Sequence, residues 1–129
     1  ENGFHLINGG GGGVMAETAH AFTEVTNRKG KVIGVLPSQT SCDSAEERAA
    51  YRPPPGYPNS YTEIIIRTHL PDSGSQGKKI SSRNHIIVLS ADIVIALPGG
   101  PGTRSEIELA LEYKKTATPA QSKRGMERV

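Results

Sequence analysis

The sequence contains no tryptophan, a single cysteine and only 5% aromatic residues. A lone cysteine, Cys42, excludes a disulfide within the chain, which is typical of proteins from a reducing compartment. Cys42 lies in a polar stretch without neighbours that would activate its thiol. We therefore expect a cytoplasmic protein whose cysteine has no catalytic role.

Long apolar runs and a strong charge of either sign are also missing. No segment approaches the roughly 20 apolar residues that a membrane span requires, and no signal peptide is visible. The net charge is only +2, so electrostatics give little support to nucleic-acid binding. We expect neither a membrane nor a nucleic acid as a partner.

The length of 129 residues indicates a single domain. Past residue 115 the composition turns polar, so we predict one domain over residues 1–115 and a poorly ordered tail over 116–129 without a further strand. The chain starts with Glu1, only a few residues before the first predicted strand. We therefore expect a fragment whose sheet is truncated at its ends.

Apolar strand-like segments alternate with helix-like segments along the chain. The predicted strands cover residues 4–7, 32–36, 63–67 and 91–97, and the predicted helices cover residues 14–27, 81–89 and 104–115. Apolar strands that alternate with helices are typical of a parallel sheet covered on both faces. We therefore predict an α/β fold, a Rossmann-like doubly wound parallel sheet that binds its ligand beyond the carboxyl ends of the strands.

A long polar segment interrupts this alternation at residues 38–61. It holds proline-rich turn sequences at 53–59, and a short helix is predicted at 44–51. Loops of this length are usually functional lids or disordered segments. The sequence leaves open whether this loop closes over a ligand.

The most informative motif is L-P-G-G-P-G-T-R-S-E at residues 97–106, directly after the last predicted strand. A glycine turn between a buried strand and a helix exposes main-chain N–H groups, and the helix dipole favours an anion there. The predicted phosphate site consists of Pro98, Gly99, Gly100, Gly102 and Thr103, with Thr103 at the helix N-cap. Alternatively, Thr103 and Glu106 form only a capping box, in which the glutamate has no chemical role.

A second glycine run, Gly9 to Gly13, follows the first predicted strand and precedes an amphipathic helix. Consecutive glycines are typical of flexible linkers, but linkers are not normally placed between a buried strand and an amphipathic helix. Glycines in this context usually mark close approach of the main chain to a ligand. We therefore predict that Gly10, Gly11, Gly12 and Gly13 contribute to the same phosphate or nucleotide site.

The run at residues 98–106 resembles the P-G-G-x-G-T-x-x-E signature of the LONELY GUY family, the cytokinin riboside monophosphate phosphoribohydrolases once labelled lysine decarboxylases. Gly13-Val14-Met15 is similar to the family's G-G-G-x-x-G-L-M segment, and Arg83 stands where the family has an arginine, although the flanking M-x-x-R-K context is absent. The resemblance covers residues 4–115. It implies catalytic roles for Arg83 and Glu106, a 5′-phosphate held by residues 99–103, and a homodimer without a metal or redox cofactor.

These roles agree with elementary chemistry. Cleavage of an N-glycosidic bond passes through an oxocarbenium-like state, so Glu106 beside the ribose can stabilise positive charge or activate water. Arg83 can clamp a phosphate or hold the glutamate in a forked pair. Apart from the resemblance, Arg83 would be interpreted as a surface arginine of a helix.

Further runs, I-I-I-R-T-H-L-P at 64–71 and S-R-N-H-I at 82–86, resemble a bacterial and archaeal Rossmann-type subgroup that is also similar to molybdenum cofactor carrier proteins. Those carriers share the glycine turns but bind a pterin phosphate without hydrolysing it. The sequence therefore predicts a hydrolase that converts a nucleoside 5′-monophosphate to base and ribose 5-phosphate. The alternative is a non-catalytic carrier or sensor of a phosphorylated ligand such as molybdenum cofactor.

No metal site is predicted, because His69, which follows a predicted strand, has no second ligand at a suitable spacing. A lysine decarboxylase would need pyridoxal phosphate on a buried lysine, and no lysine stands at the end of a predicted strand. We therefore expect no cofactor.

Overall fold

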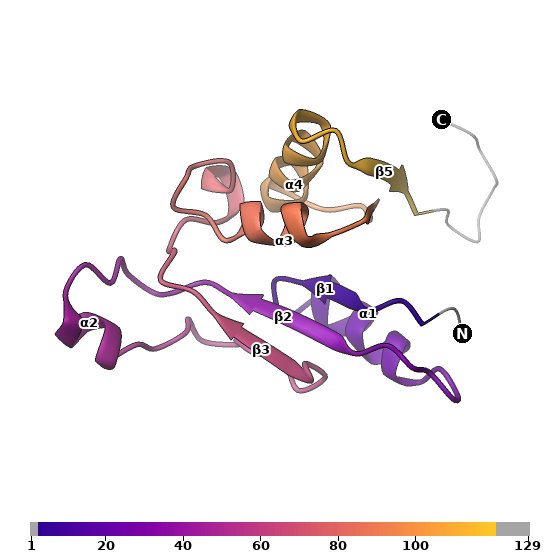
Figure 1. The fold of residues 1–129 in the computed structure, drawn as a ribbon, viewed down its shortest axis with the longest axis horizontal. Coiled ribbons are helices and arrows are strands. Elements are labelled where there is room, and N and C mark those ends of the chain that lie inside the picture. The colour runs from indigo at the N-terminus through magenta and orange to yellow at the C-terminus, as the bar shows by residue number, and fades with distance from the viewer. Residues whose placement is uncertain (1–2, 121–129) are drawn as a thin grey trace.

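A computed structural model describes residues 3–120 and shows a mixed α/β protein with parallel strands (Figure 1). Within this range the elements are, in chain order, β1 (Leu6–Asn8), α1 (Val14–Thr23), β2 (Val32–Leu36), α2 (Ala45–Ala49), β3 (Ile64–Arg67), the 3-10 turn η1 (Gly74–Gln76), α3 (Asn84–Ser90), β4 (Ile93–Ala96), α4 (Pro101–Glu112) and β5 (Thr116–Pro119). All four predicted strands and three predicted main helices are present. None of the helices in this range is both long enough and apolar enough to cross a membrane.

The strands form two parallel sheets, whereas the sequence predicted one continuous sheet. The first has the order β1-β2-β3, and the second pairs β4 with β5. In Figure 1 the arrows of β2 and β3 point to the left and that of β5 to the right. The glycine turns therefore follow strands of two different sheets, β1 and β4. Apolar periodicity identifies strands but carries no information on which strand pairs with which, so a continuous Rossmann-like sheet stays a prediction.

The best-buried parts of the molecule lie around β2 and between α3 and α4. Val32, Val35 and Leu36 of β2 have no exposed surface, as expected for the central strand of a sheet. Val88 of α3 packs against Leu109 and Ala110 of α4 in a small apolar cluster. Each half of the molecule thus has its own core.

The outer strands are more exposed than the sequence predicted. Ile64, Ile65 and Ile66 of β3 are each more than 40% exposed, and Ile95 of β4 is 64% exposed. In the described part of the chain β3 pairs only with β2, and β4 only with β5. An edge strand lacks a neighbour on one side, so an apolar sequence there does not guarantee burial.

The segment after residue 115, predicted to be a tail without a strand, begins with β5. Its main chain pairs with β4 from Ile93↔Thr116 to Ala96↔Pro119, and the N–H of Ala120 donates to the carbonyl of Ala96 at 2.8 Å. Every residue of β5 is exposed. Main-chain pairing therefore stabilises a strand that has no apolar run, and residues 121–129 of the predicted tail lie outside the described residues.

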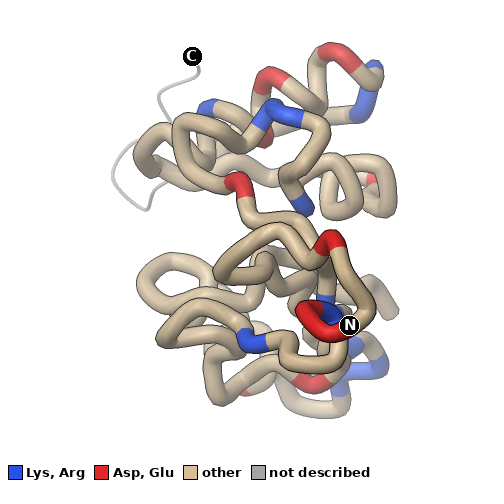
Figure 2. Tube along the Cα trace, turned by 90° about the vertical axis from the view of Figure 1, so that its left-hand side faces the viewer, with Lys and Arg blue, Asp and Glu red and all other residues tan. Residues whose placement is uncertain are grey.

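The long loop contains the predicted short helix. Ser44 caps α2: its side chain accepts from the N–H of Glu47, and the Glu47 carboxylate accepts from the N–H of Ser44, a complete capping box. Elsewhere the boundaries shift, since α1 ends at Thr23 instead of residue 27. Figure 2 shows Lys and Arg interspersed with Asp and Glu along the trace, without a face of one sign.

Candidate functional site

The glycine turn after β1 has the predicted order of strand, turn and helix. Asn8 closes it from both sides: its Oδ1 accepts from the N–H of Gly10 at 2.9 Å, and its Nδ2 donates to the carbonyl of Met15 at 3.2 Å. Gly10 and Gly13 have φ of 74° and 60°, a conformation that side chains with a Cβ rarely adopt. These two glycines are therefore required by the path of the main chain.

One side of this turn is packed and the other is open. A Cβ at Gly9 would collide with Nη2 of Arg83, and a Cβ at Gly11 would lie 2.9 Å from the ring of Tyr57. At Gly12 and Gly13 an added Cβ would meet no atom within 4 Å. The turn is held against protein along Gly9 to Gly11 and presents Gly12 and Gly13 outward.

Arg83 is buried beneath this turn, with only 5% of its surface exposed. It stands at the N-cap of α3, where its Nε donates to the carbonyl of Val35 at 3.2 Å and its Nη1 donates to Oδ1 of Asn84 at 2.8 Å. Its Nη2 faces Gly9. The interpretation as a surface arginine is therefore wrong, because the guanidinium of Arg83 is buried and held by hydrogen bonds. Its catalytic role, which the family resemblance implies, stays a prediction.

Glu106 lies half-buried on α4, within range of that cation. Burial raises the pKa of Glu106 above its ordinary value, and the positive charge of Arg83 opposes this rise in pKa. The net effect is a carboxyl group that holds its proton to higher pH than an exposed glutamate. The hydrogen bonds that the structure gives the Arg83 side chain go to Val35 and Asn84, so Arg83 influences the other predicted catalytic residue, Glu106, through its charge.

The second glycine turn differs from its prediction. Helix α4 begins at Pro101 with Gly100 as N-cap and no side-chain cap, so Thr103 is a residue of the first turn of the helix and not the cap. The capping box between Thr103 and Glu106 is therefore wrong as well. Proline suits the first position of a helix because its φ is already helical and it lacks the N–H that would be unpaired there. The helix consequently starts earlier than a threonine cap would place it.

A pocket of about 530 Å³ lies at the amino end of α4. Its lining residues come from the second glycine turn, from α4 and from the segment around η1, and they are Ser75, Lys78, Gly99, Gly100, Pro101, Arg104, Ser105 and Glu108. Lys78 and Arg104 supply positive charge, and each pairs with Glu108, at 3.5 and 2.9 Å. No sequence motif marks Lys78 for this site, because its proximity to α4 depends on tertiary structure.

The segment around η1, which lines part of this pocket, contacts both α3 and α4. The hydroxyl of Ser105 donates to the carbonyl of Gly74 at 3.0 Å. A Cβ at Gly77 would lie 2.5 Å from Nδ2 of Asn84 and 2.8 Å from Cβ of Ser105. Asn84 and Ser105 are both buried, and sequence reasoning missed both. Through Asn84, which accepts from Arg83, these contacts tie the position of the guanidinium to the base of α4.

The two glycine turns meet only indirectly. Arg83 touches the first turn at Gly9, and its charge acts on Glu106, which α4 carries beyond the second turn. The pocket at α4 is lined by Gly99 and Gly100, whereas residues 10–13 are not among its lining. This pocket thus includes only one of the two turns that we predicted to form one site, and the shared site stays a prediction.

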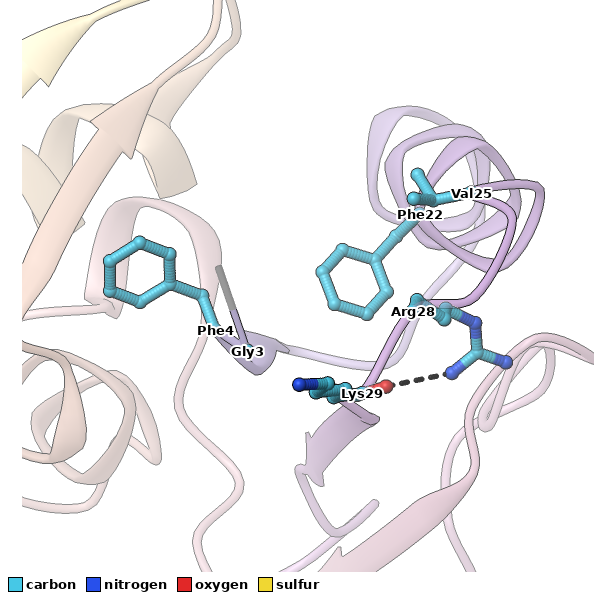
Figure 3. A pocket seen from close by; sticks show the side chains of 7 residues that line it. Gly3, Phe4, Phe22, Val25, Arg28 and Lys29 are labelled. Atoms are coloured by element: carbon cyan, nitrogen blue, oxygen red, sulfur yellow. Dashed lines mark hydrogen bonds between the residues drawn. The ribbon is translucent and has the colours of Figure 1, made fainter. Parts of the chain in front are cut away.

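A smaller pocket of about 160 Å³ lies near the amino end of β1, on the side away from the glycine turn. Figure 3 shows Phe4 and Phe22 facing this space, with Arg28 at its rim. The guanidinium of Arg28 donates to the carbonyl of Gly30 at 2.8 Å and pairs with Glu63 at 2.7 Å. The guanidinium of Arg28 is thus already paired with protein groups. We therefore interpret this pocket as imperfect packing between the start of β1 and the end of α1, and not as a ligand site.

Comparison with known proteins places the chain in a family. It is 35% identical over 115 residues to an uncharacterised protein of Archaeoglobus fulgidus, a match that covers 89% of this chain and 58% of the relative. The chain thus spans less than two thirds of that relative. No solved structure is significantly similar to it. The sequence model of the SLOG cluster4 family matches residues 1–125, and the chain therefore belongs to the SLOG cluster4 family.

Proposed function

We propose that this protein binds a nucleoside 5′-monophosphate and hydrolyses its N-glycosidic bond, releasing the base and ribose 5-phosphate. The observation that carries the proposal is the buried guanidinium of Arg83 against Gly9 of the first glycine turn, whose charge also acts on the half-buried carboxyl group of Glu106. A buried cation next to a carboxyl group with a raised pKa is typical of functional sites. Membership of the SLOG cluster4 family supports a nucleotide-related ligand.

The phosphate would bind at the amino end of α4. The first-turn N–H groups of a helix lack partners within the helix, and the dipole makes this end favourable for an anion. Lys78 and Arg104 line the pocket at this end and add positive charge. An incoming phosphate would compete with Glu108 for Lys78 and Arg104, and with Glu112 for Lys78. These carboxylates would therefore lower the affinity for phosphate.

Glu106 would be the catalytic base. In the balanced reaction the glycosidic bond to C1′ breaks, water adds at C1′, one proton of that water passes to the carboxylate, and the departing base gains a proton. A carboxyl group whose pKa is raised towards neutrality is a stronger base once ionised than an ordinary glutamate. Arg83 would hold Glu106 in its ionised form when substrate is bound.

A Rossmann-like fold accompanies this proposal. The sheets have the orders β1-β2-β3 and β4-β5, with β1 at the free edge of the first. In a Rossmann-like fold β1 and β4 would be parallel neighbours in one five-stranded sheet of order 3-2-1-4-5, whereas here they belong to two sheets whose strands point in opposite directions in Figure 1. Pairing of β1 with β4 would also cover Ile93 and Ile95 of β4, which are at least half exposed. We further propose that the protein is a homodimer, which sedimentation velocity would test. We also propose that it is located in the cytoplasm.

The test is to incubate the protein with AMP and modified adenosine monophosphates and to measure free base by chromatography. We expect release by the wild type, a loss of at least about 100-fold in Glu106→Gln, as for removal of a general base, and near-normal release by Glu46→Gln. Glu46 is exposed on α2 and does not line the pocket at α4, so it controls for the loss of a carboxylate in general.

Binding without turnover would favour the carrier or sensor instead. One observation favours that alternative: Glu106 does not line the pocket at the amino end of α4. A carrier would bind AMP or a pterin phosphate equally well before and after Glu106→Gln. Calorimetric titration of both variants with both ligands distinguishes the two functions.

A further inference from the structure

The first glycine turn is clamped by a residue of the long loop, Asn59. The N–H of Asn59 donates to the carbonyl of Gly10 at 2.7 Å, and its side-chain Nδ2 donates to the carbonyl of Gly11 at 2.9 Å. The two residues are 48 or more positions distant from Asn59 in sequence. We propose that Asn59 is a positioning residue, which orients the main-chain amides of the glycine turn towards the nucleotide. This inference rests on the proposed function for the identity of the ligand.

The clamp is itself held firmly. The Oδ1 of Asn59 accepts from the N–H of Tyr61 at 3.0 Å and from the hydroxyl of Thr62 at 3.2 Å. Thr62 lies against Gly34 of β2, and the ring of Tyr61 stacks on His20 of α1 with centroids 4.4 Å apart. The side chain of Asn59 is therefore fixed to the sheet and to the helix on either side of the glycine turn.

As a consequence, some main-chain polar groups of the turn are bonded to protein and others are free. Asn8 takes the N–H of Gly10, and Asn59 takes the carbonyls of Gly10 and Gly11. Over residues 3–120 no hydrogen bond uses the N–H groups of Gly11, Gly12 or Gly13. N–H groups donate to acceptor atoms of a ligand and carbonyl oxygens do not, so the turn is left with its donors free and two of its acceptors occupied.

Clamping also addresses the flexibility of five consecutive glycines. Glycine loses more conformational freedom on ordering than any other residue, so an unrestrained turn would have to be ordered when ligand binds. Two hydrogen bonds from Asn59, together with the ring of Tyr57 against Gly11, order the turn beforehand. The long loop, whose role was open, is thereby assigned a function: it shapes the glycine turn.

The test compares Asn59→Ala and Asn59→Asp with the wild type. The aspartate keeps the acceptor for Tyr61 and Thr62 but replaces the donor to Gly11 by a carboxylate oxygen and adds a negative charge, whereas the alanine removes the side-chain contacts without adding charge. We expect the Kd for AMP, measured by calorimetry, to rise about tenfold in both variants, which corresponds to roughly 1.4 kcal/mol. If AMP is turned over, KM should rise by a similar factor while kcat changes less than about twofold, because Asn59 touches no reacting atom.

Tyr51→Phe is the matched control. It removes a hydrogen bond of the same loop, from the hydroxyl of Tyr51 to the carbonyl of Pro37 at 3.0 Å, and leaves Asn59 and its contacts in place. We expect a fall in Tm similar to that of Asn59→Ala with less than about a twofold change in the Kd for AMP. Equal losses of affinity in the control and in the Asn59 variants would show a general effect of loop stability and would overturn the positioning role.

A ligand-free measurement keeps this inference separate from the proposed function. Heteronuclear NOE values for the amides of residues 11–13 should fall in Asn59→Ala, since the turn loses its restraint. Unchanged values would overturn the positioning role even if AMP binds. If the wild type binds neither AMP nor inorganic phosphate while the NOE values fall as expected, then the proposed function fails and the clamp stands.

Discussion

The two glycine turns follow apolar strands and precede helices, yet their surroundings are very different. The turn at Gly9 to Gly13 is wedged between Arg83, Met15 and Tyr57, and side chains of Asn8 and Asn59 bind its main chain. The turn at Gly99 to Gly102 ends in a proline that starts α4, and it borders a pocket with charged residues at its rim. The conformation of the first turn is thus fixed by packing and by side-chain hydrogen bonds. The second turn is defined by the proline that starts α4 and by the charged residues nearby. The same local motif therefore serves two physical purposes.

The largest effect that separates the turns should come from their arginines. Arg83→Lys loses the donors to Val35 and Asn84 in a buried site, and we expect the free energy of unfolding to fall by about 2–4 kcal/mol. Arg104→Lys, in an 81% exposed side chain, should change it by less than about 0.5 kcal/mol. Urea unfolding of both variants measures the difference. Equal and small losses would show that the burial of Arg83 does not contribute to the stability of the first turn.

The glycines themselves provide a second contrast. Gly9→Ala places a methyl group against the guanidinium of Arg83, and overpacking of this kind costs about 1–3 kcal/mol. Gly100→Ala meets no atom within 4 Å, and its φ of −93° suits alanine, so only the loss of a good N-cap residue applies, less than about 1 kcal/mol. Thermal unfolding would rank them. A Gly100 variant less stable than the Gly9 variant would contradict the division into a packed turn and an open one.

Two glutamates of α4 should respond to pH with opposite signs. The pKa of Glu106 is raised by burial, so the folded protein binds its proton more tightly than the unfolded chain, and stability falls as pH rises from the ordinary glutamate pKa through the raised one. The pKa of Glu108 is lowered, chiefly by its hydrogen bond with Arg104, so its contribution is lost as pH falls from the ordinary pKa through the lowered one.

Consequently, Glu106→Gln should gain stability relative to the wild type as pH rises through the upper window. Glu108→Gln should be less stable than the wild type above the ordinary glutamate pKa, and this difference in stability should vanish as pH falls through the lowered pKa of Glu108. Tm profiles of both variants and the wild type between pH 3 and pH 8 would check the signs. Parallel profiles for the two variants would mean that Glu106 is not buried as described.

The smallest expected effect concerns the cations at the second turn. Lys78→Ala and Arg104→Ala should each weaken AMP binding by about two- to fivefold, since exposed charges act through solvent, and added salt should remove most of the difference. Glu108→Gln should strengthen binding, because it frees Arg104 and removes one of the two carboxylates that pair with Lys78. Calorimetry at low and high salt tests this, and an affinity that is insensitive to salt in all four proteins would place the phosphate elsewhere.

The local features were the most predictable from sequence. The bounds of β2, the capping of α2 by Ser44 and the order of strand, glycine turn and helix at both turns follow from apolar runs, caps and glycines. The start of α4 was predicted wrongly because a threonine cap and a proline at the first helical position compete, and the proline prevailed. β5 was missed because main-chain pairing, not composition, forms it.

The candidate site was predictable only in part. Arg83 and Glu106 were identified by family resemblance, but their burial and their mutual electrostatic influence depend on contacts between α3, α4 and the glycine turn. Lys78, Asn84 and Asn59 carry no motif that could have identified them. Lys78 and Asn59 act on partners that are distant in sequence, as in the bond from Asn59 to Gly11, and Asn84 acts on its neighbour Arg83 in a buried site that only the tertiary structure creates.

The composition and motifs alone established a chain with parallel strands, two glycine turns and one cysteine that forms no internal disulfide, because hydrophobic periodicity, helix caps and glycine conformations act over a few residues. Folding in three dimensions settled how the strands divide into two sheets, which turn is packed and which is open, and which residues surround Arg83. Strand pairing and burial depend on distant segments whose mutual fit no local pattern encodes.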